Sequence, residues 1–297
     1  MIVVFTAVQV YVQPAMPDKP NTPFTLAGHR VLAMRGPDAL RFAHAQFMSD
    51  VAGLADGHWH WSGWLTPKGR VVALFALLRL DAEHLWLVLP DADPEALAAQ
   101  LRRFVFRSKV ALEPRGDLRV GGAFAPPLQA RGGMLAGSGD AGFELDLGGD
   151  GGARAMRLGP AAATEVDDAL VARWTTADLA HGLPRLDASQ SGEWTPQQLS
   201  LERLRAFSVK KGCYPGQEIV ARTHFLGQAK RGLVLLESDA LIDVGAEVIG
   251  DGQAIGTVVS AMDGLALAVL PLAREADSLT AGGAAVRERP LLGGLSR

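Results

Sequence analysis

Cysteine is almost absent from this chain, which has Cys213 as its single thiol in 297 residues. One cysteine excludes an internal disulfide and every Cys-x-x-Cys metal or redox site. It also argues against ligation of an iron–sulfur cluster by this chain alone, because such clusters take a set of several thiolates. An unpaired thiol is typical of the reducing cytoplasm, and we expect the protein to be cytoplasmic.

Long apolar runs and a strong overall charge are also missing. Residues 1–12 are apolar, but the first basic residue is Lys19, whereas a secretory signal peptide begins with a charged segment. The longest other apolar run, residues 71–78, is far too short to span a bilayer. The net charge of −3 excludes a protein that binds nucleic acid through its whole surface, so any basic patch is local. We expect no membrane partner and no direct nucleic-acid partner.

The length favours two or three domains with a substantial core. Period-two patterns predict strands, and helical spacing with Pro near the first turn predicts helices. The strands are expected at 24–34, 58–61, 71–80 and 84–89, and the helices at 36–51, from Pro94 through an apolar stripe ending at Val105, and at 161–181. From Lys230, short β-rich runs alternate with Gly and Asp turns, which predicts a small barrel. The expected class is α+β with a C-terminal antiparallel β-barrel.

Two formal motifs are rejected on their context. Residues 137–142 match GxGxxG, but residues 143–147 alternate like a strand, whereas a dinucleotide site needs a helix N-terminus there. We interpret the glycines as a hairpin turn. His58 and His60 resemble metal ligands, but no third ligand stands at a useful spacing, so a strand with one aromatic face is favoured. No metal site is expected.

A basic cluster follows the helix that begins at Pro94. It consists of Arg102, Arg103, Arg107 and Lys109. Such a cluster is often a solvated face that also favours a helix C-terminus, and it is sometimes a ligand site. The sequence leaves both interpretations open.

The most informative stretch is residues 210–218, Lys-Lys-Gly-Cys-Tyr-Pro-Gly-Gln-Glu. Pro215 and Gly216 fit the central positions of a type II turn, where Gly takes a positive φ. Gly212 is expected to allow a close approach of the backbone to a ligand or to another strand. Gln217 and Glu218 are expected in the first turn of a helix, where a carboxylate is favoured. Ile219, Val220 and Phe225 are expected to anchor that helix.

The positive charges of Lys210, Lys211 and Arg222 would favour the reactive thiolate of Cys213. A buried, inert cysteine in an ordinary turn is the alternative, and residue chemistry alone does not separate the two. A Cys-His nucleophile would need His224 or His181 as its base, and the sequence cannot place either one.

At this stretch the sequence resembles a known family. Lys211-Gly212-Cys213-Tyr214-x-Gly216-Gln217-Glu218 is similar to the KGCYxGQE signature of the YgfZ-type folate-binding proteins, which are relatives of the glycine cleavage aminomethyltransferase, or T-protein. Residues 31–51 and 182–197 resemble the family's N-terminal segment and its approach to the cysteine motif. The resemblance covers essentially residues 24–290.

The resemblance implies a three-domain, T-protein-like fold around a central opening that binds tetrahydrofolate. It places the folate-binding region at residues 1–228, as two α+β subdomains with the inner one at about 46–115, and the barrel at 229–297. The family is implicated in the assembly or repair of iron–sulfur clusters in client enzymes, including enzymes that thiolate tRNA. Folate and iron–sulfur client proteins are therefore the expected partners.

The resemblance also implies the site residues. Cys213 is the expected catalytic thiol beside the folate opening. The expected folate-binding or motif residues are Lys211, Gly212, Tyr214, Gly216, Gln217, Glu218, Arg222, Trp64 and Arg185.

Two departures from the family bear on activity. Aminomethyltransferases carry acidic residues shortly after the position of Gly69, whereas this chain has Ala73 and Leu74. Ala180 stands where relatives have a Glu expected to bind the pterin edge, and His181 or Asp178 is left as a substitute. Because reaction at a folate nitrogen needs a positioned acid–base group, an accessory role is favoured over an aminomethyltransferase or demethylase. An interaction module with a decayed ligand site is the third alternative.

Overall fold

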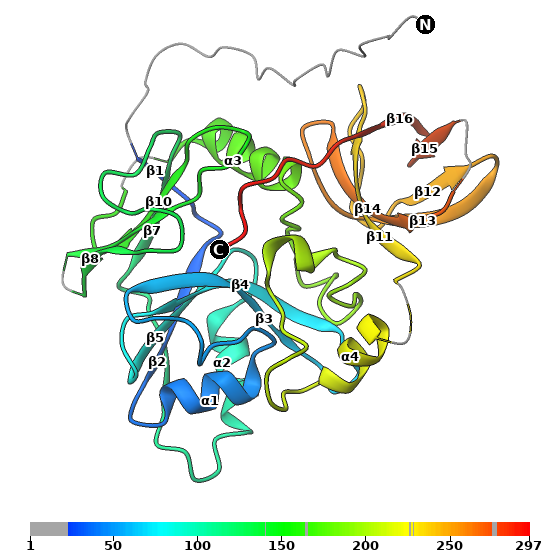
Figure 1. The fold of residues 1–297 in the computed structure, drawn as a ribbon. Coiled ribbons are helices and arrows are strands. Elements are labelled where there is room, and N and C mark those ends of the chain that lie inside the picture. The colour runs from blue at the N-terminus through cyan, green and yellow to red at the C-terminus, as the bar shows by residue number, and fades with distance from the viewer. Residues whose placement is uncertain (1–22, 140, 164–165, 226, 228, 275–277) are drawn as a thin grey trace, which may run out of the picture.

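The computed structural model describes residues 23–139, 141–163, 166–225, 227, 229–274 and 278–297. The predictions for the apolar residues 1–12 and for the prolines that follow them lie outside the described residues. No helix in these ranges is long and apolar enough to cross a membrane. The chain forms two antiparallel sheets and a closed barrel, which surround a common centre (Figure 1).

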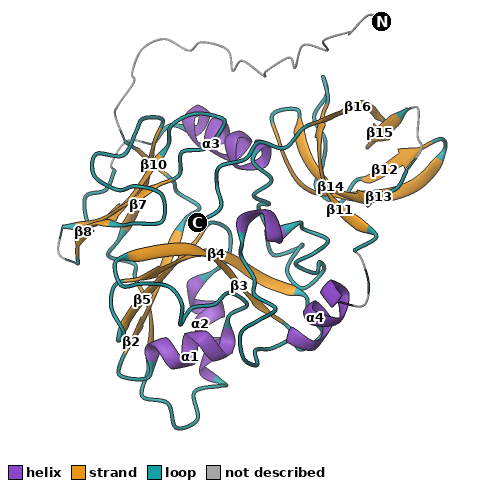
Figure 2. Cartoon of the chain, viewed as in Figure 1, coloured by secondary structure: helices purple, strands orange, loops and turns teal. Residues whose placement is uncertain are grey.

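The first sheet, here called the central sheet, is covered by helices on one face. Its strands, in spatial order, are β3 (His58–Leu65), β4 (Val71–Arg79), β5 (His84–Leu89), β2 (Arg30–Arg35) and β6 (Ala111–Pro114). The helices α1 (Ala39–Gln46) and α2 (Pro94–Arg102) pack on its outer face (Figure 2). The side chain of Asp93 accepts hydrogen bonds from the N–H groups of Glu95 and Ala96, which fixes the start of α2.

The sequence of strand β4 is almost entirely apolar, and the packing of the central sheet explains why. Successive side chains point to opposite faces. Ala73, Phe75 and Leu77 belong to the core under α1 and α2, whereas Leu74 and Ala76 belong to the core at the centre of the molecule. Both faces are buried, so every position of this strand favours an apolar residue.

The second sheet contains β1 (Phe24–Thr25), β7 (Arg119–Ala123), β10 (Ala155–Gly159), β9 (Gly142–Asp146) and β8 (Ala136–Ser138). Strands β8 and β9 form a hairpin around Gly137 and Gly142, as predicted for the rejected GxGxxG match. The helix α3 (Asp168–Ala180) packs beside this sheet, with the Trp174 ring against Gly122. A Cβ at Gly122 would lie 2.9 Å from that ring, so only glycine allows the contact.

The barrel closes in the order β11 (Arg231–Glu237), β14 (Leu265–Pro271), β13 (Gln253–Met262), β12 (Glu247–Gly250), β15 (Leu279–Ala281) and β16 (Ala284–Arg289). All its pairs are antiparallel. The predicted C-terminal barrel is therefore confirmed. Closure pairs every strand on both sides and leaves no free edge.

Three predicted elements differ from the structure in their bounds. The expected strand 24–34 is interrupted by a turn in which the N–H of His29 bonds to the carbonyl of Leu26, and its halves β1 and β2 join different sheets. The expected helix 161–181 begins only at Asp168, where Asp167 caps it. The helix α2 ends at Arg102, so Phe104 and Val105 lie in the following loop rather than in a helical stripe. Local capping and turn hydrogen bonds override the longer apolar pattern in each case.

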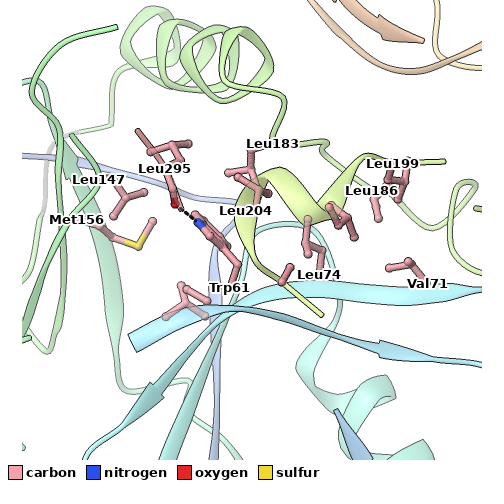
Figure 3. Close-up of a cluster of buried hydrophobic side chains, with 14 of the residues drawn as sticks. Trp61, Val71, Leu74, Leu147, Met156, Leu183, Leu186, Leu199, Leu204 and Leu295 are labelled. Atoms are coloured by element: carbon pink, nitrogen blue, oxygen red, sulfur yellow. Dashed lines mark hydrogen bonds between the residues drawn. The ribbon is translucent and has the colours of Figure 1, made fainter. Parts of the chain in front are cut away.

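Residues 290–297 leave the barrel and return to the centre (Figure 1). The N–H of Leu292 donates to the carbonyl of Ala180 at 2.9 Å, and the Trp61 indole N–H donates to the carbonyl of Leu295 at 2.8 Å. Leu295 is 2% exposed and lies among Trp61, Leu147, Met156 and Leu183 (Figure 3). This segment, here called the C-terminal strap, fills the space that the two sheets and the barrel leave between them.

Replacement of Leu295 by Ala tests this packing. We expect Leu295→Ala to lower the free energy of unfolding by about 2 to 5 kcal/mol, because it removes buried methyl groups from a site that three units share. The urea midpoint of the full chain is the measurement. Leu241, which is 84% exposed on the barrel, is the matched control, and its Ala variant should stay within about 0.5 kcal/mol of the parent. Equal midpoints for the two variants would contradict the packing described.

Candidate functional site

The cysteine motif forms an exposed turn before the helix α4 (Gln217–Phe225). Cys213 is a free thiol and is exposed. Gln217 and Glu218 occupy the first turn of α4, as predicted. The thiol is therefore presented at the surface, so the interpretation of Cys213 as buried is wrong, and its reactivity stays a prediction.

Lys211 connects this turn to the end of α1. Its ammonium group donates to the carbonyls of Phe47 at 2.6 Å and Ser49 at 3.0 Å, and also to the carbonyl of His44. Carbonyls at a helix C-terminus lack partners within the helix, so a buried cation satisfies them. Burial lowers the pKa of Lys211 from 10.5 to about 8, and the nearby Asp50 carboxylate opposes that shift. With its donors used in this way, Lys211 fixes the turn to the fold.

Tyr214 and Gln217 hold the turn from inside. The Tyr214 hydroxyl donates to the carbonyl of Ser208 at 3.0 Å, and burial raises the pKa of that hydroxyl to about 12. The Gln217 amide donates to the carbonyl of Lys211 at 2.9 Å. The Lys211 ammonium also lies 4.8 Å from the centre of the Tyr214 ring. These three side chains brace the backbone that carries Cys213.

The two glycines beside Cys213 have different roles. Gly216 has a φ of +78°, as the predicted type II turn requires, and a Cβ there would lie 2.6 Å from the Cα of Gly69. Gly216 thus joins the cysteine turn to the turn after β3. A Cβ at Gly212 would meet no atom within 4 Å, so the predicted close approach at Gly212 is not found among the described residues.

The helix α4 is held by two of the three predicted anchors. Val220 is 1% exposed, and Ile219, although 38% exposed, packs so closely on the turn after β3 that a Cβ at Gly69 would lie 2.9 Å from its own Cβ. The expectation that Phe225 anchors the helix is wrong, because its side chain is 67% exposed. Glu218 and Arg222 are exposed as well and lie on the same short helix.

Trp64 and Arg185, the other two predicted site residues, lie elsewhere. Trp64 is buried under the helices of the central sheet, and its ring meets Phe104 edge-on at 5.9 Å. The Arg185 guanidinium pairs with the Asp91 carboxylate at 2.7 Å and donates to the carbonyl of Pro90. No described contact joins either side chain directly to Cys213.

The candidate histidines are also committed elsewhere. His181 is 2% exposed, its Nδ1 bonds to the carbonyl of Ala177 at 2.7 Å, and its Nε2 accepts from the N–H of Gly151. His224 is exposed and packs on Phe225. His60 bonds to the hydroxyl of Ser49. Within the described ranges, no three His, Cys, Asp or Glu side chains are placed to hold a metal ion.

A second polar cluster lies at the centre of the molecule, and it joins Asp178 and Arg185, which the sequence analysis named, to Arg154, which it did not. Arg154 and Asp178 form an ion pair of 2.7 Å, with side chains only 3% and 2% exposed. The Arg185 guanidinium lies 3.8 Å from the same carboxylate. The Nε and Nη2 atoms of Arg154 are buried and have no hydrogen-bond partner among the residues that the structure describes. No signal in the sequence marked Arg154, which sits in a Gly-rich stretch that reads as loop.

A small cavity adjoins this pair. Asp178 and His29 line it together with apolar side chains that include Trp61, Met156 and Trp174. Its volume is about 10 Å³, enough for roughly one water molecule. Burial, together with the charges of nearby arginines, keeps the pKa of His29 well below its usual value, so His29 is neutral there. This cavity is therefore too small for the folate expected from the resemblance.

The two positions that depart from the family pattern also lie near the centre. Of the neighbouring residues Ala73 and Leu74, Leu74 faces the centre, whereas Ala73 faces α1 and α2. Neither one supplies a carboxylate. Ala180 accepts the hydrogen bond from Leu292 of the C-terminal strap. Of the two substitutes left open for the missing Glu, Asp178 lines the cavity and His181 is used in binding the loop at Gly151.

Comparison with known proteins bears on this architecture. A family model described as the CAF17 C-terminal β-barrel domain matches residues 230–290. The tRNA-modifying protein YgfZ of Klebsiella pneumoniae is 28% identical, over 82% of this chain and 81% of its own length. The YgfZ of Aliivibrio fischeri strain MJ11 is 29% identical, over 81% of this chain and 82% of its own. The chain is a homologue of the YgfZ proteins. The resemblance predicted from the cysteine motif is therefore confirmed.

Two further proteins are similar to this YgfZ homologue. An uncharacterized protein of Haemophilus influenzae is 28% identical, over 80% of this chain and 84% of its own length. The crystal structure of the glycine cleavage system aminomethyltransferase T from Bartonella henselae superposes with a TM-score of 0.71, over 93% of this chain and 86% of that chain. At 17% identity this likeness shows the fold alone. The predicted T-protein-like architecture is confirmed.

The contrast between the two glycines of the motif gives a test. We expect Gly216→Ala to lower the free energy of unfolding by about 2 kcal/mol or more, because Ala is strained at positive φ and its Cβ overlaps the backbone at Gly69. Gly212→Ala is the matched control and should change it by less than about 0.5 kcal/mol. Thermal unfolding of both variants provides the comparison. A larger loss for Gly212→Ala would refute the assignment of the turn.

Proposed function

We propose that this YgfZ homologue binds tetrahydrofolate at its centre and is an accessory protein for assembly or repair of iron–sulfur clusters in client enzymes, including enzymes that modify tRNA. Cys213 is the working thiol. The names of the relatives and the T-protein-like fold support this proposal. The single unpaired thiol supports a cytoplasmic setting.

The Arg154–Asp178 pair is the observation that carries the folate part. The edge of a pterin presents adjacent N–H donors, which suit a carboxylate such as Asp178, and a carbonyl oxygen, which suits an N–H donor. Arg154 has two buried nitrogens without a hydrogen-bond partner in the described part of the chain. Because an unpaired buried donor is costly, a ligand that satisfies these atoms gains binding free energy. The rings of Trp61 and Trp174 offer apolar walls for a flat heterocycle.

The chemistry of the cavity fits a pterin, but its volume does not. About 10 Å³ cannot hold a two-ring heterocycle. The C-terminal strap is the element most easily displaced, since it is neither helix nor strand and is tied down by individual hydrogen bonds. Binding at the centre therefore requires residues 291–297 to move outward. The free energy of that movement lowers the apparent affinity for the ligand.

Titration calorimetry with tetrahydrofolate tests this requirement. We expect the parent chain to bind weakly and Leu295→Ala to bind about tenfold more tightly, because the variant releases the strap more readily. The Leu241→Ala control should bind like the parent. Heat of binding that is equal in all three proteins would contradict displacement of the strap.

An interaction module without a ligand is the second candidate, and the small cavity is the observation that favours it. No heat of binding at millimolar tetrahydrofolate, from either the parent or Leu295→Ala, would select this candidate and reject the folate part of the proposal. Methylene transfer is less well supported, because Leu74 supplies no acid–base group to the centre.

The thiol has its own test. In a strain that lacks the native protein, we expect Cys213→Ser to restore little activity of a cluster-containing tRNA-modifying enzyme, because the hydroxyl cannot act as a thiolate. The side chain is exposed, so the unfolding midpoint should stay unchanged and separate loss of chemistry from loss of fold. Full restoration of client activity by Cys213→Ser would show that the thiol is dispensable.

A further inference from the structure

The loop after α2 has a composition that neither the thiol site nor the centre uses. We call residues 103–109, Arg-Phe-Val-Phe-Arg-Ser-Lys, the basic loop; it lies beyond α1 and α2 at the lower edge of Figure 1. Phe106 is 88% exposed, the highest value among the large apolar side chains of the described ranges. A phenylalanine so exposed gains nothing for stability, so its surface is available to a partner.

The charges on the basic loop are not neutralised. Arg103, Arg107 and Lys109 are exposed, and their side chains make no ion pair or hydrogen bond with the part of the chain that the structure describes. The carboxylate of Asp38, which touches the loop, accepts the backbone N–H of Lys109 and pairs with Arg41. The loop is thus locally positive on a protein whose net charge is −3.

The basic loop is held at both ends. Phe104 packs edge-on against Trp64 at 5.9 Å. At the other end, the N–H of Lys109 donates to the Asp38 carboxylate at 2.7 Å, and the N–H of Asp38 donates back to the carbonyl of Lys109. Phe106 and its flanking cations therefore project from a fixed frame, which reduces the entropy lost when a partner binds.

A short series of contacts links the basic loop to the cysteine turn. Trp64, against which Phe104 packs, pairs with Phe47 through a β-bridge. The carbonyl of Phe47 in turn accepts a hydrogen bond from Lys211. The loop and the cysteine turn are therefore linked through Trp64 and Phe47.

We propose that the basic loop binds a single-stranded segment of RNA, with Arg103, Arg107 and Lys109 on phosphates and a base stacked on Phe106. Cations that alternate with an exposed aromatic ring match the alternation of phosphate and base along a strand. An acidic peptide would satisfy the charges but would leave the face of Phe106 without a flat partner. This inference departs from the expectation of no direct nucleic-acid partner. Only the choice of RNA as the ligand rests on the proposed function.

Fluorescence anisotropy with a labelled single-stranded RNA of about 15 nucleotides tests the proposal, at salt between about 50 and 200 mM. We expect Phe106→Ala to weaken binding about 5- to 100-fold at constant salt. Arg103→Gln/Arg107→Gln should weaken binding and reduce the slope of log affinity against log salt by about 1 to 2. Leu241→Ala and Lys230→Gln, at exposed positions on the barrel side, are the matched controls and should behave like the parent.

Three outcomes would overturn the proposal. They are no binding of the RNA at 50 mM salt, equal losses in the loop variants and the controls, or tighter binding of an oligoglutamate peptide than of the RNA. Tetrahydrofolate calorimetry on the loop variants separates this inference from the proposed function. A loop variant that keeps its folate binding but loses RNA binding supports the proposal that the basic loop binds RNA. Loss of folate binding in every protein would contradict only the proposed folate site at the centre.

Discussion

The buried ion pair between Arg154 and Asp178 is the interaction on which the centre depends. Two charges that are almost fully removed from water are tolerable only when they neutralise each other, and removal of one partner leaves the other as an uncompensated charge. The pair joins the second sheet to α3, and Arg185 connects the same carboxylate to the central sheet through Asp91. The relative positions of the two sheets are therefore set by electrostatics as well as by apolar packing.

The thiol and the cavity at the centre are separate sites that share one apolar cluster. Lys211 is bonded to the end of α1, whereas Tyr214, next to Cys213, packs in the same cluster as Leu74 and Ala76, and Ala76 lines the cavity. Cys213 does not line the cavity, and its position beside a folate opening stays a prediction. In the proposed function, a bound folate acts on the thiol through the shared apolar cluster rather than by direct reaction with Cys213.

Local signals predicted the barrel, the hairpin at Gly142 and the turn at Gly216 from the sequence, because each depends on residues a few positions apart. The role of Lys211 could not be predicted in this way, since its carbonyl partners lie more than 160 positions earlier in the chain. Arg154 was hidden for the same reason: its partner stands on α3, and its own surroundings read as loop. The resemblance to a family predicted the fold, but it did not predict how small the cavity at the centre is.

The return of the C-terminal strap to the centre has a consequence for synthesis of the protein. The strands of both sheets are synthesised well before Leu295, so the apolar walls around Trp61 and Met156 face water until the strap has left the ribosome. During that interval the nascent chain exposes an apolar surface, which chaperones bind and which promotes aggregation. The core between the two sheets is therefore completed only when residues 290–297 return to it.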